Sequence, residues 1–310
     1  MELLKTLCSI QATSGDEAAM TDFILDHVQK NKSDWKVQPE IIHGEGFQDA
    51  IILVFGKPRT AIFAHMDNIG YAVSYGKNLV RIGGPRGESG WRLVGKDSQG
   101  EIDCKLSVRW LWADGNKKEE LKYRFNRKID RGTPLSFKPN FRDKEKSVQS
   151  PYLDNRLGVW NALQVAQTLE DGIIVFSTYE EVGGGSVQFL AKYIQEKYGV
   201  KQALISDITL ATDGVKPKKG VAISMRDKGV PRQSYLRKII QLARENKIPY
   251  QLEVEDAGGS DGTVLQHSSG VWDWCFIGPP EQNYHTPNEK AWKVDIQAMN
   301  DLYALLMKKL

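Results

Sequence analysis

Short apolar runs recur in both halves of the chain, and each has the length of a buried strand. The run at 173–176 is rich in β-branched residues and precedes a helical pattern. Comparable runs, bounded by glycine, proline or charged residues, lie at 51–55, 60–64, 203–206, 221–225, 250–254 and 272–277. The run at 37–42 contains Pro39, which predicts an edge strand because proline cannot donate to a sheet ladder.

Apolar residues at helical spacing lie between these runs. Ser14, followed three residues later by Glu17, has the pattern of a capping box and predicts a helix start. Further helices are predicted after Asp154, through Phe189 to Ile194, at 232–246, around Val264, and at 293–309. Strands that alternate with helices predict an α/β protein, specifically a mixed-sheet α/β/α sandwich.

The middle of the chain has a different pattern. Short alternating runs such as 105–112 and 121–125 lie between turn-forming clusters, as in a small β domain. We therefore expect a catalytic domain of residues 1–74 and 149–310, interrupted by a β-barrel-like insert at 75–148. Residues 116–146 hold eleven Lys and Arg against five Asp and Glu, without an RNA-recognition aromatic pattern. A solvated or subunit-facing surface is favoured over a nucleic-acid interface.

Composition limits the class of protein. The 310 residues are 41% hydrophobic and 26% charged, with a net charge of +3, which is ordinary for a globular protein and does not indicate a nucleic-acid partner. Three widely spaced cysteines without a CxxC pattern indicate neither a disulfide framework nor a cysteine metal site. The first residues lack a secretory apolar region and no run approaches eighteen apolar residues, so we expect a cytoplasmic protein without a membrane partner.

Metal-competent side chains follow several of the predicted strands. They are His65 and Asp67, Glu180 and Glu181, Asp207 and His285, together with Asp154 at a helix start. Histidines and carboxylates without thiolates suit zinc, or cobalt and manganese as substitutes. A bridging carboxylate permits two divalent cations about 3.5–4 Å apart, an arrangement used for hydrolysis.

Two of these positions have simpler interpretations when taken alone. Glu180 and Glu181 match an exposed loop tip, and neighbouring strand residues point to opposite faces, so both reach one site only if the chain leaves strand geometry. The glycines at 183–185 permit such a departure. Asp154 is equally suited to cap a helix.

The order of the motifs resembles that of the M42 family of dinuclear metallo-aminopeptidases, from near Ser14 to the C-terminus and excluding the insert. The matching segments are Ala64-His65-Met66-Asp67-Asn68-Ile69-Gly70, Asp154-Asn155-Arg156, Glu180-Glu181-Val182-Gly183, Ser206-Asp207 with Ala211-Thr212-Asp213, Gly258-Gly259-Ser260-Asp261 and His285-Thr286-Pro287-Asn288-Glu289. The resemblance implies an α/β catalytic domain with a small β insert, peptide substrates and a homo-oligomer.

The resemblance also implies a role for each candidate. His65 and Asp207 would hold one cation, Glu181 and His285 the other, and Asp154 would bridge them. Asp67 would orient His65, and Glu180 would be the general base. The chain departs from the family pattern at Asn68, where a glutamate is usual, and its insert is short. The change at Asn68 concerns how a substrate amine is held, and the short insert concerns assembly and substrate access. Neither changes the proposed metal ligands.

Other functions fit the sequence less well. A phosphate-binding loop at the glycines lacks the following GK[ST], and adjacent glutamates are poorly placed for a glycosidase, whose carboxyl groups lie roughly 5–9.5 Å apart. A related metal-dependent deacylase or carboxypeptidase stays open. A non-catalytic paralogue that acts as a binding scaffold is the alternative from another class, although it has no need for a complete ligand set.

Overall fold

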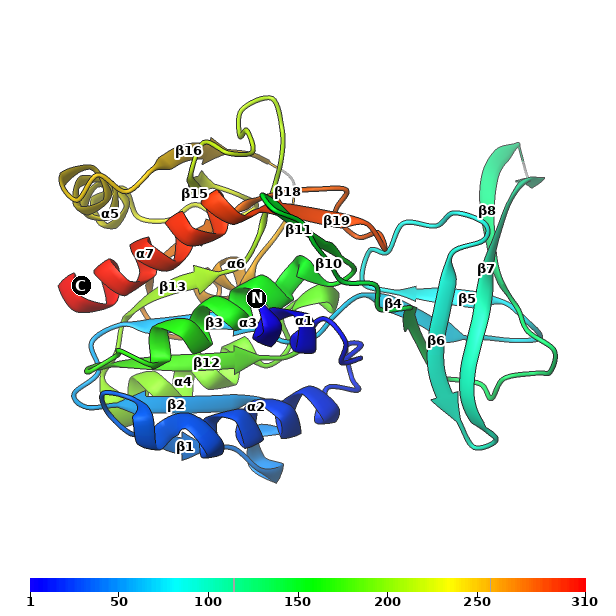
Figure 1. The fold of residues 1–310 in the computed structure, drawn as a ribbon, viewed down its shortest axis with the longest axis horizontal. Helices are drawn as coiled ribbons and strands as arrows, with labels where there is room; N and C mark the ends of the chain where they lie inside the picture. The colour runs from blue at the N-terminus through cyan, green and yellow to red at the C-terminus, as the bar shows by residue number, and fades with distance from the viewer. Residues whose placement is uncertain (114, 257) are drawn as a thin grey trace.

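A computed structural model describes residues 1–113, 115–256 and 258–310. Figure 1 shows a larger body, in which helices flank a sheet, and a smaller lobe built of strands. Among the described residues, no helix combines the length and apolar character required to cross a membrane. The α/β class predicted from the alternating pattern is confirmed.

An eight-stranded mixed sheet forms the centre of the larger body. Its strands, in spatial order, are β1 (Glu40–Ile42), β2 (Ile51–Phe55), β12 (Gly172–Ser177), β3 (Ala61–His65), β13 (Gln202–Ser206), β17 (Asp273–Gly278), β15 (Val221–Arg226) and β16 (Tyr250–Val254). The four central strands β12, β3, β13 and β17 are parallel, and β2 and β15 pair with them in the antiparallel sense. Strand β1 lies at the edge, as Pro39 predicts, and begins only after that proline.

Helices cover both faces of this sheet, so its central strands read as continuous apolar runs. One face packs against α1 (Glu2–Leu7), α2 (Ala18–Asn31), α3 (Leu153–Ala166), α5 (Gln233–Glu245) and α7 (Lys293–Lys309). The other face packs against α4 (Val187–Tyr198) and α6 (Asp261–Gln266). Two short 3-10 turns, η1 (Lys32–Asp34) and η2 (Glu45–Phe47), lie in the connections around β1. The three layers confirm the predicted sandwich.

Two smaller sheets complete the fold. A five-stranded sheet has the order β10 (Arg142–Asp143), β11 (Ser147–Ser150), β19 (Glu289–Trp292), β18 (Pro280–Gln282) and β14 (Thr209–Leu210). The smaller lobe is a six-stranded sheet with the order β5 (Leu79–Ile82), β4 (Gly70–Val73), β9 (Pro134–Phe137), β6 (Arg92–Asp97), β7 (Gly100–Ala113) and β8 (Asn116–Arg124). A bridge between Asn78 and Lys122 brings the two edges of this sheet together, which gives it a nearly closed, barrel-like form.

Several basic side chains of the smaller lobe are paired within the lobe. Arg127 forms an ion pair with Asp97 (2.6 Å), and Lys138 forms one with Asp103 (2.7 Å). Pairing of this kind reduces the positive charge that the basic segment presents to solvent.

The predicted capping box at Ser14 is wrong. Helix α2 begins at Ala18, and Glu17, the residue before it, makes no side-chain cap. The Ser14 hydroxyl instead donates a hydrogen bond to Asp67 Oδ2 (2.6 Å), a residue distant in sequence. A partner beyond the local segment therefore outweighs the capping preference.

Candidate metal centre

Three strand ends meet at the carboxyl edge of the central sheet. His65 is the last residue of β3, and Asp207 directly follows β13, which pairs with β3. Glu180 and Glu181 lie in a 3-10 turn, η3 (Glu180–Val182), after β12, the other neighbour of β3. Ligands of α/β proteins bind beyond this edge of the sheet, and four of the candidates predicted from the sequence come together there.

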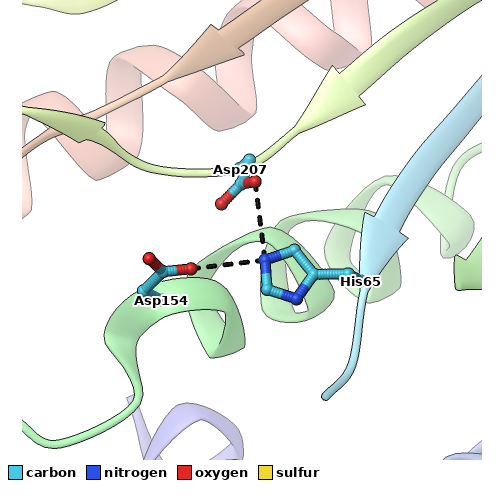
Figure 2. A group of neighbouring side chains, drawn as sticks. All are labelled: His65, Asp154 and Asp207. Carbon is cyan, nitrogen blue, oxygen red and sulfur yellow. Dashed lines mark ion pairs between the residues drawn. The ribbon is translucent and has the colours of Figure 1, made fainter. Parts of the chain in front are cut away.

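A first set of donors, called here the inner group, consists of His65, Asp154 and Asp207. Their side chains point toward one another in Figure 2, each from a different element. His65 Nε2 lies 3.3 Å from Asp154 Oδ1 and 3.5 Å from Asp207 Oδ2. The donor atoms all lie within 4.8 Å of one another, as the ligands of a single cation do.

A second set, the outer group, consists of Asp154, Glu181 and His285. His285, from the loop between β18 and β19, places Nε2 3.4 Å from Asp154 Oδ2 and 3.5 Å from Glu181 Oε2. These donors also lie within 4.8 Å of one another. Asp154 thus directs one carboxylate oxygen to each group, which is the geometry required of a bridging ligand.

Asp67 lies beside the ring nitrogen of His65 that does not face the inner group. Its Oδ1 lies 3.3 Å from His65 Nδ1, and this contact leaves Nε2 directed at the inner group. The buried Asp67 carboxylate also accepts hydrogen bonds from Ser14 and from the backbone N–H groups of Glu180 (3.1 Å) and Glu181 (3.2 Å). One carboxylate therefore ties the first loop, β3 and the acidic turn together.

His285 is oriented by a different set of contacts, which the sequence did not indicate. Its Nδ1 lies 2.9 Å from the carbonyl oxygen of Gly84, in the loop between β5 and β6 of the smaller lobe. Glu289 accepts hydrogen bonds from the backbone N–H of His285 (3.0 Å) and of Asp154 (3.3 Å). His285 has a φ of 59°, an uncommon conformation for a non-glycine residue that these contacts hold in place.

The acidic turn shows how adjacent glutamates reach one site. Strand β12 ends at Ser177, and Tyr179 adopts a left-handed conformation with a φ of 64°. Both Glu180 and Glu181 then lie in η3 and line the same cavity. The predicted departure from strand geometry is confirmed, but it begins at Tyr179 and precedes Gly183.

The electrostatics of the centre favour bound cations. Burial raises the pKa of Glu180 and of Glu181 well above the usual range, and the negative charge of Asp154 adds to the effect on Glu181. Burial likewise raises the pKa of Asp207 to about 6. Glu181 Oε1 is buried and has no hydrogen-bond partner among the described residues. A divalent cation would offset this excess of buried negative charge, so the donor set fits a metal centre.

The pKa of His65 is also raised well above its usual value. Burial acts to lower the pKa, but the carboxylates of Asp207, Asp154 and Asp67 outweigh it. Carboxylates that surround an imidazole in this way stabilise a positive charge, which a bound cation would supply.

Asn68, the departure from the family pattern, does not face the centre. Its Oδ1 accepts hydrogen bonds from Arg156 Nη2 (2.7 Å) and the backbone N–H of Ala12 (3.0 Å), and its Nδ2 donates to the carbonyl of Ile69 (2.8 Å). The side chain is fully buried. Asn68 therefore supports the loop behind the centre and is not available to a substrate amine.

A cavity of about 420 Å³ opens next to both donor groups. Its wall near the centre includes Glu180, Tyr284 and Gly84. It is also lined by the polar or charged residues Thr209, Asp227, Lys228, Glu253, Glu255, Ser260 and Thr263, with the apolar Leu210, Val264 and Phe276. A volume of this size accommodates an amino-acid side chain together with part of a peptide backbone.

Two donor groups and a cavity lie beyond the parallel strands of a mixed sheet, an arrangement that suits a metal-dependent hydrolase. The sequence profile of the M42 glutamyl aminopeptidase family matches residues 105–302, and the chain belongs to this family. The resemblance inferred from the ordered motifs is confirmed, and with it metal-dependent aminopeptidase activity as the class of function.

Individual relatives are similar to this chain over most of its length. A protein of Acetivibrio thermocellus, named only provisionally as an aminopeptidase, is 27% identical over 95% of this chain and 94% of its own length. A TET aminopeptidase from a marine-sediment Thaumarchaeota archaeon shares the fold, with a TM-score of 0.86 and 19% identity over 100% of this chain and 96% of that one.

A further structural relative extends the comparison to an assembling enzyme. The TET1 peptidase of Pyrococcus horikoshii, described as assembling into a tetrahedron or a large octahedral shell, has a TM-score of 0.79 and 21% identity over 100% of this chain and 99% of that one. At this identity the similarity shows a common fold.

Proposed function

We propose that the protein is a two-cation aminopeptidase that removes N-terminal residues from short peptides. The observation that supports this proposal most directly is the position of Asp154, which directs its two oxygens to two separate donor groups. In this proposal His65 and Asp207 hold one cation, Glu181 and His285 hold the other, and Asp154 bridges them. Zinc suits these nitrogen and oxygen donors, with cobalt or manganese as substitutes.

Bound cations would acidify a water molecule and polarise the scissile carbonyl. Residues of the chain would carry out the proton transfer and orient the ligands. Glu180, which lines the cavity, would take a proton from the attacking water and give it to the leaving amine. Asp67 would keep His65 in the orientation that presents Nε2.

The organisation of the chain is part of the proposal. Residues 1–74 and 149–310 would form the catalytic domain, and residues 75–148 an insert that serves assembly or substrate access. The first boundary would move to before Gly70, because β4 (Gly70–Val73) pairs with β5 and β9 of the smaller lobe. The assembly of the related TET1 peptidase supports a homo-oligomer. Three buried free cysteines, Cys8, Cys104 and Cys275, support a reducing compartment such as the cytoplasm.

A time course on a defined peptide mixture tests the activity. The protein is treated with a chelator, then reconstituted with zinc, cobalt or manganese, and the products are followed by mass spectrometry. Metal-dependent, stepwise loss from the amino end supports the proposal. Loss from the carboxyl end would identify a carboxypeptidase, and removal of acyl groups alone a deacylase. A preparation that binds peptides without cleaving them would identify a scaffold.

Glu180→Gln tests the assigned base. The substitution keeps the size of the side chain and removes its ability to accept a proton, so we expect kcat to fall by about 10²–10⁴-fold. The cation content, measured by elemental analysis, should stay at the wild-type value because Glu180 belongs to neither donor group. Turnover close to the wild-type rate would remove Glu180 from this role.

A further inference from the structure

The loop between β5 and β6 connects the smaller lobe to the metal centre. Besides the contact between Gly84 and His285, the backbone N–H of Arg86 donates a hydrogen bond to the carbonyl of His285 (2.9 Å). The Tyr71 hydroxyl donates to the carbonyl of Arg86 (2.7 Å). The backbone of Arg86 is therefore held on both sides, at a fixed position beside a proposed ligand.

The side chain of Arg86 is pre-organised by an aromatic ring. Its Cζ lies 4.3 Å from the centroid of the Tyr284 ring, and Tyr284 lines the cavity. Arg86 is exposed, and within the described parts of the chain no ion pair involves it. A guanidinium that stacks by its face keeps the N–H donors along its edge for a planar anion such as a carboxylate.

The charge of Arg86 is opposite to that of most of the surrounding site. The cavity is lined by one cation, Lys228, and by the more numerous carboxyl groups of Asp154, Glu180, Glu181, Asp207, Asp227, Glu253 and Glu255. Such a wall attracts the amine of a peptide and repels its free carboxylate. A short peptide carries both charges within a few residues, so its carboxylate needs a cation near the rim.

We propose that Arg86 binds the terminal carboxylate of short peptide substrates and so gives the enzyme a preference for di- and tripeptides with a free carboxyl end. The inference rests on the proposed function and adds that the N-terminal residue enters the cavity while the leaving portion faces the loop that carries Arg86. Each residue spans at most about 3.6 Å, so the terminal carboxylate of such a peptide stays close to the centre. The neighbouring Tyr284 and His285 place Arg86 within that region.

The test compares a trialanine substrate with its C-terminal amide in the metal-loaded enzyme. The variants are Arg86→Gln and, as a matched control, Arg59→Gln, which removes an exposed arginine just before β3, at the end opposite His65. We expect the wild-type enzyme to favour the free acid, and Arg86→Gln to reduce kcat/KM for the acid by about tenfold, equivalent to about 1.4 kcal/mol. The loss should appear mainly in KM, and kcat/KM for the amide should stay unchanged.

Arg59→Gln should leave both substrates at wild-type values. Equal loss on the acid and the amide in Arg86→Gln, no loss on either, or a wild-type enzyme indifferent to the carboxyl end would each overturn the inference. Cleavage of the amide from its amino end shows that the proposed function holds even if the role of Arg86 fails. No cleavage of either peptide by the metal-loaded wild-type enzyme would count against both.

Discussion

The inner and outer donor groups share Asp154 but are supported very differently. His65, of the inner group, ends a buried strand, and its side chain is 2% exposed. His285, of the outer group, lies in a loop, and its side chain is 19% exposed. The ring of His65 is oriented by a carboxylate of the larger body, whereas that of His285 is oriented by a backbone carbonyl of the smaller lobe.

This contrast indicates that the two cations would not be equivalent. A histidine fixed by a buried strand and a charged partner has little freedom to leave a cation, and the carboxylate strengthens its basicity. A more exposed histidine, whose ring is oriented by a neutral carbonyl, binds a cation less tightly. We therefore expect the inner cation to bind more tightly and the outer cation to exchange first.

The largest effect is expected from Asp154→Asn, which removes the carboxylate shared by both groups. Loss of an outer hydrogen-bond partner alone costs about 10–100-fold in metal affinity, so loss of a bridging ligand should cost more for each cation. Elemental analysis should find both cations depleted, and activity should be abolished, with unchanged circular dichroism. A variant that keeps one tightly bound cation would break the assignment of Asp154 as a bridge.

A smaller and asymmetric effect is expected when each histidine is removed in turn. His285→Ala should bind one cation per chain and melt close to the wild-type temperature, because its side chain is partly exposed. His65→Ala should lose the inner cation and also destabilise the apoprotein by about 1–3 kcal/mol, because Asp67 and Asp207 lose a buried partner. Metal titration and thermal unfolding measure the two quantities. Identical behaviour of the two variants would contradict the inner and outer distinction.

The most selective effect is expected from Gly84→Ala. A Cβ at this position would lie 3.0 Å from His285 Nδ1 and 3.3 Å from its Cε1, so the ring must shift. We expect affinity for the outer cation to fall by about tenfold and the inner cation to be unaffected, as measured by competition with a metal indicator.

Gly46→Ala is the control for this substitution, because a Cβ there meets nothing within 4 Å. Equal weakening of both cations by Gly84→Ala would show that the loop acts on the whole centre rather than on His285.

Much of the fold and of the candidate site was predictable, because both depend on local sequence patterns. The buried strand at 173–176 and the acids after it identified the acidic turn, and strand ends at His65 and Asp207 identified the edge where ligands gather. Position at the end of a parallel strand fixes where a side chain lies, without knowledge of the rest of the fold.

Contacts between distant segments were not predictable. The carbonyl of Gly84 meets a histidine 201 positions away, and a backbone carbonyl leaves no trace in the residue type. Ser14 matched a local capping pattern, but its hydroxyl donates a hydrogen bond to Asp67, 53 positions away. From the sequence, Asn68 appeared only as the replacement of an active-site carboxylate. The sequence did not show that the Asn68 side chain accepts a hydrogen bond from Arg156.

The wide spacing of the donors along the chain has a consequence for synthesis. The first proposed ligand is residue 65 and the last is residue 285, shortly before the final helix. A nascent chain on the ribosome therefore lacks the complete proposed centre until residue 285 has been added. In the proposed function, a product that ends before His285 would lack the histidine of the outer group and would not cleave peptides.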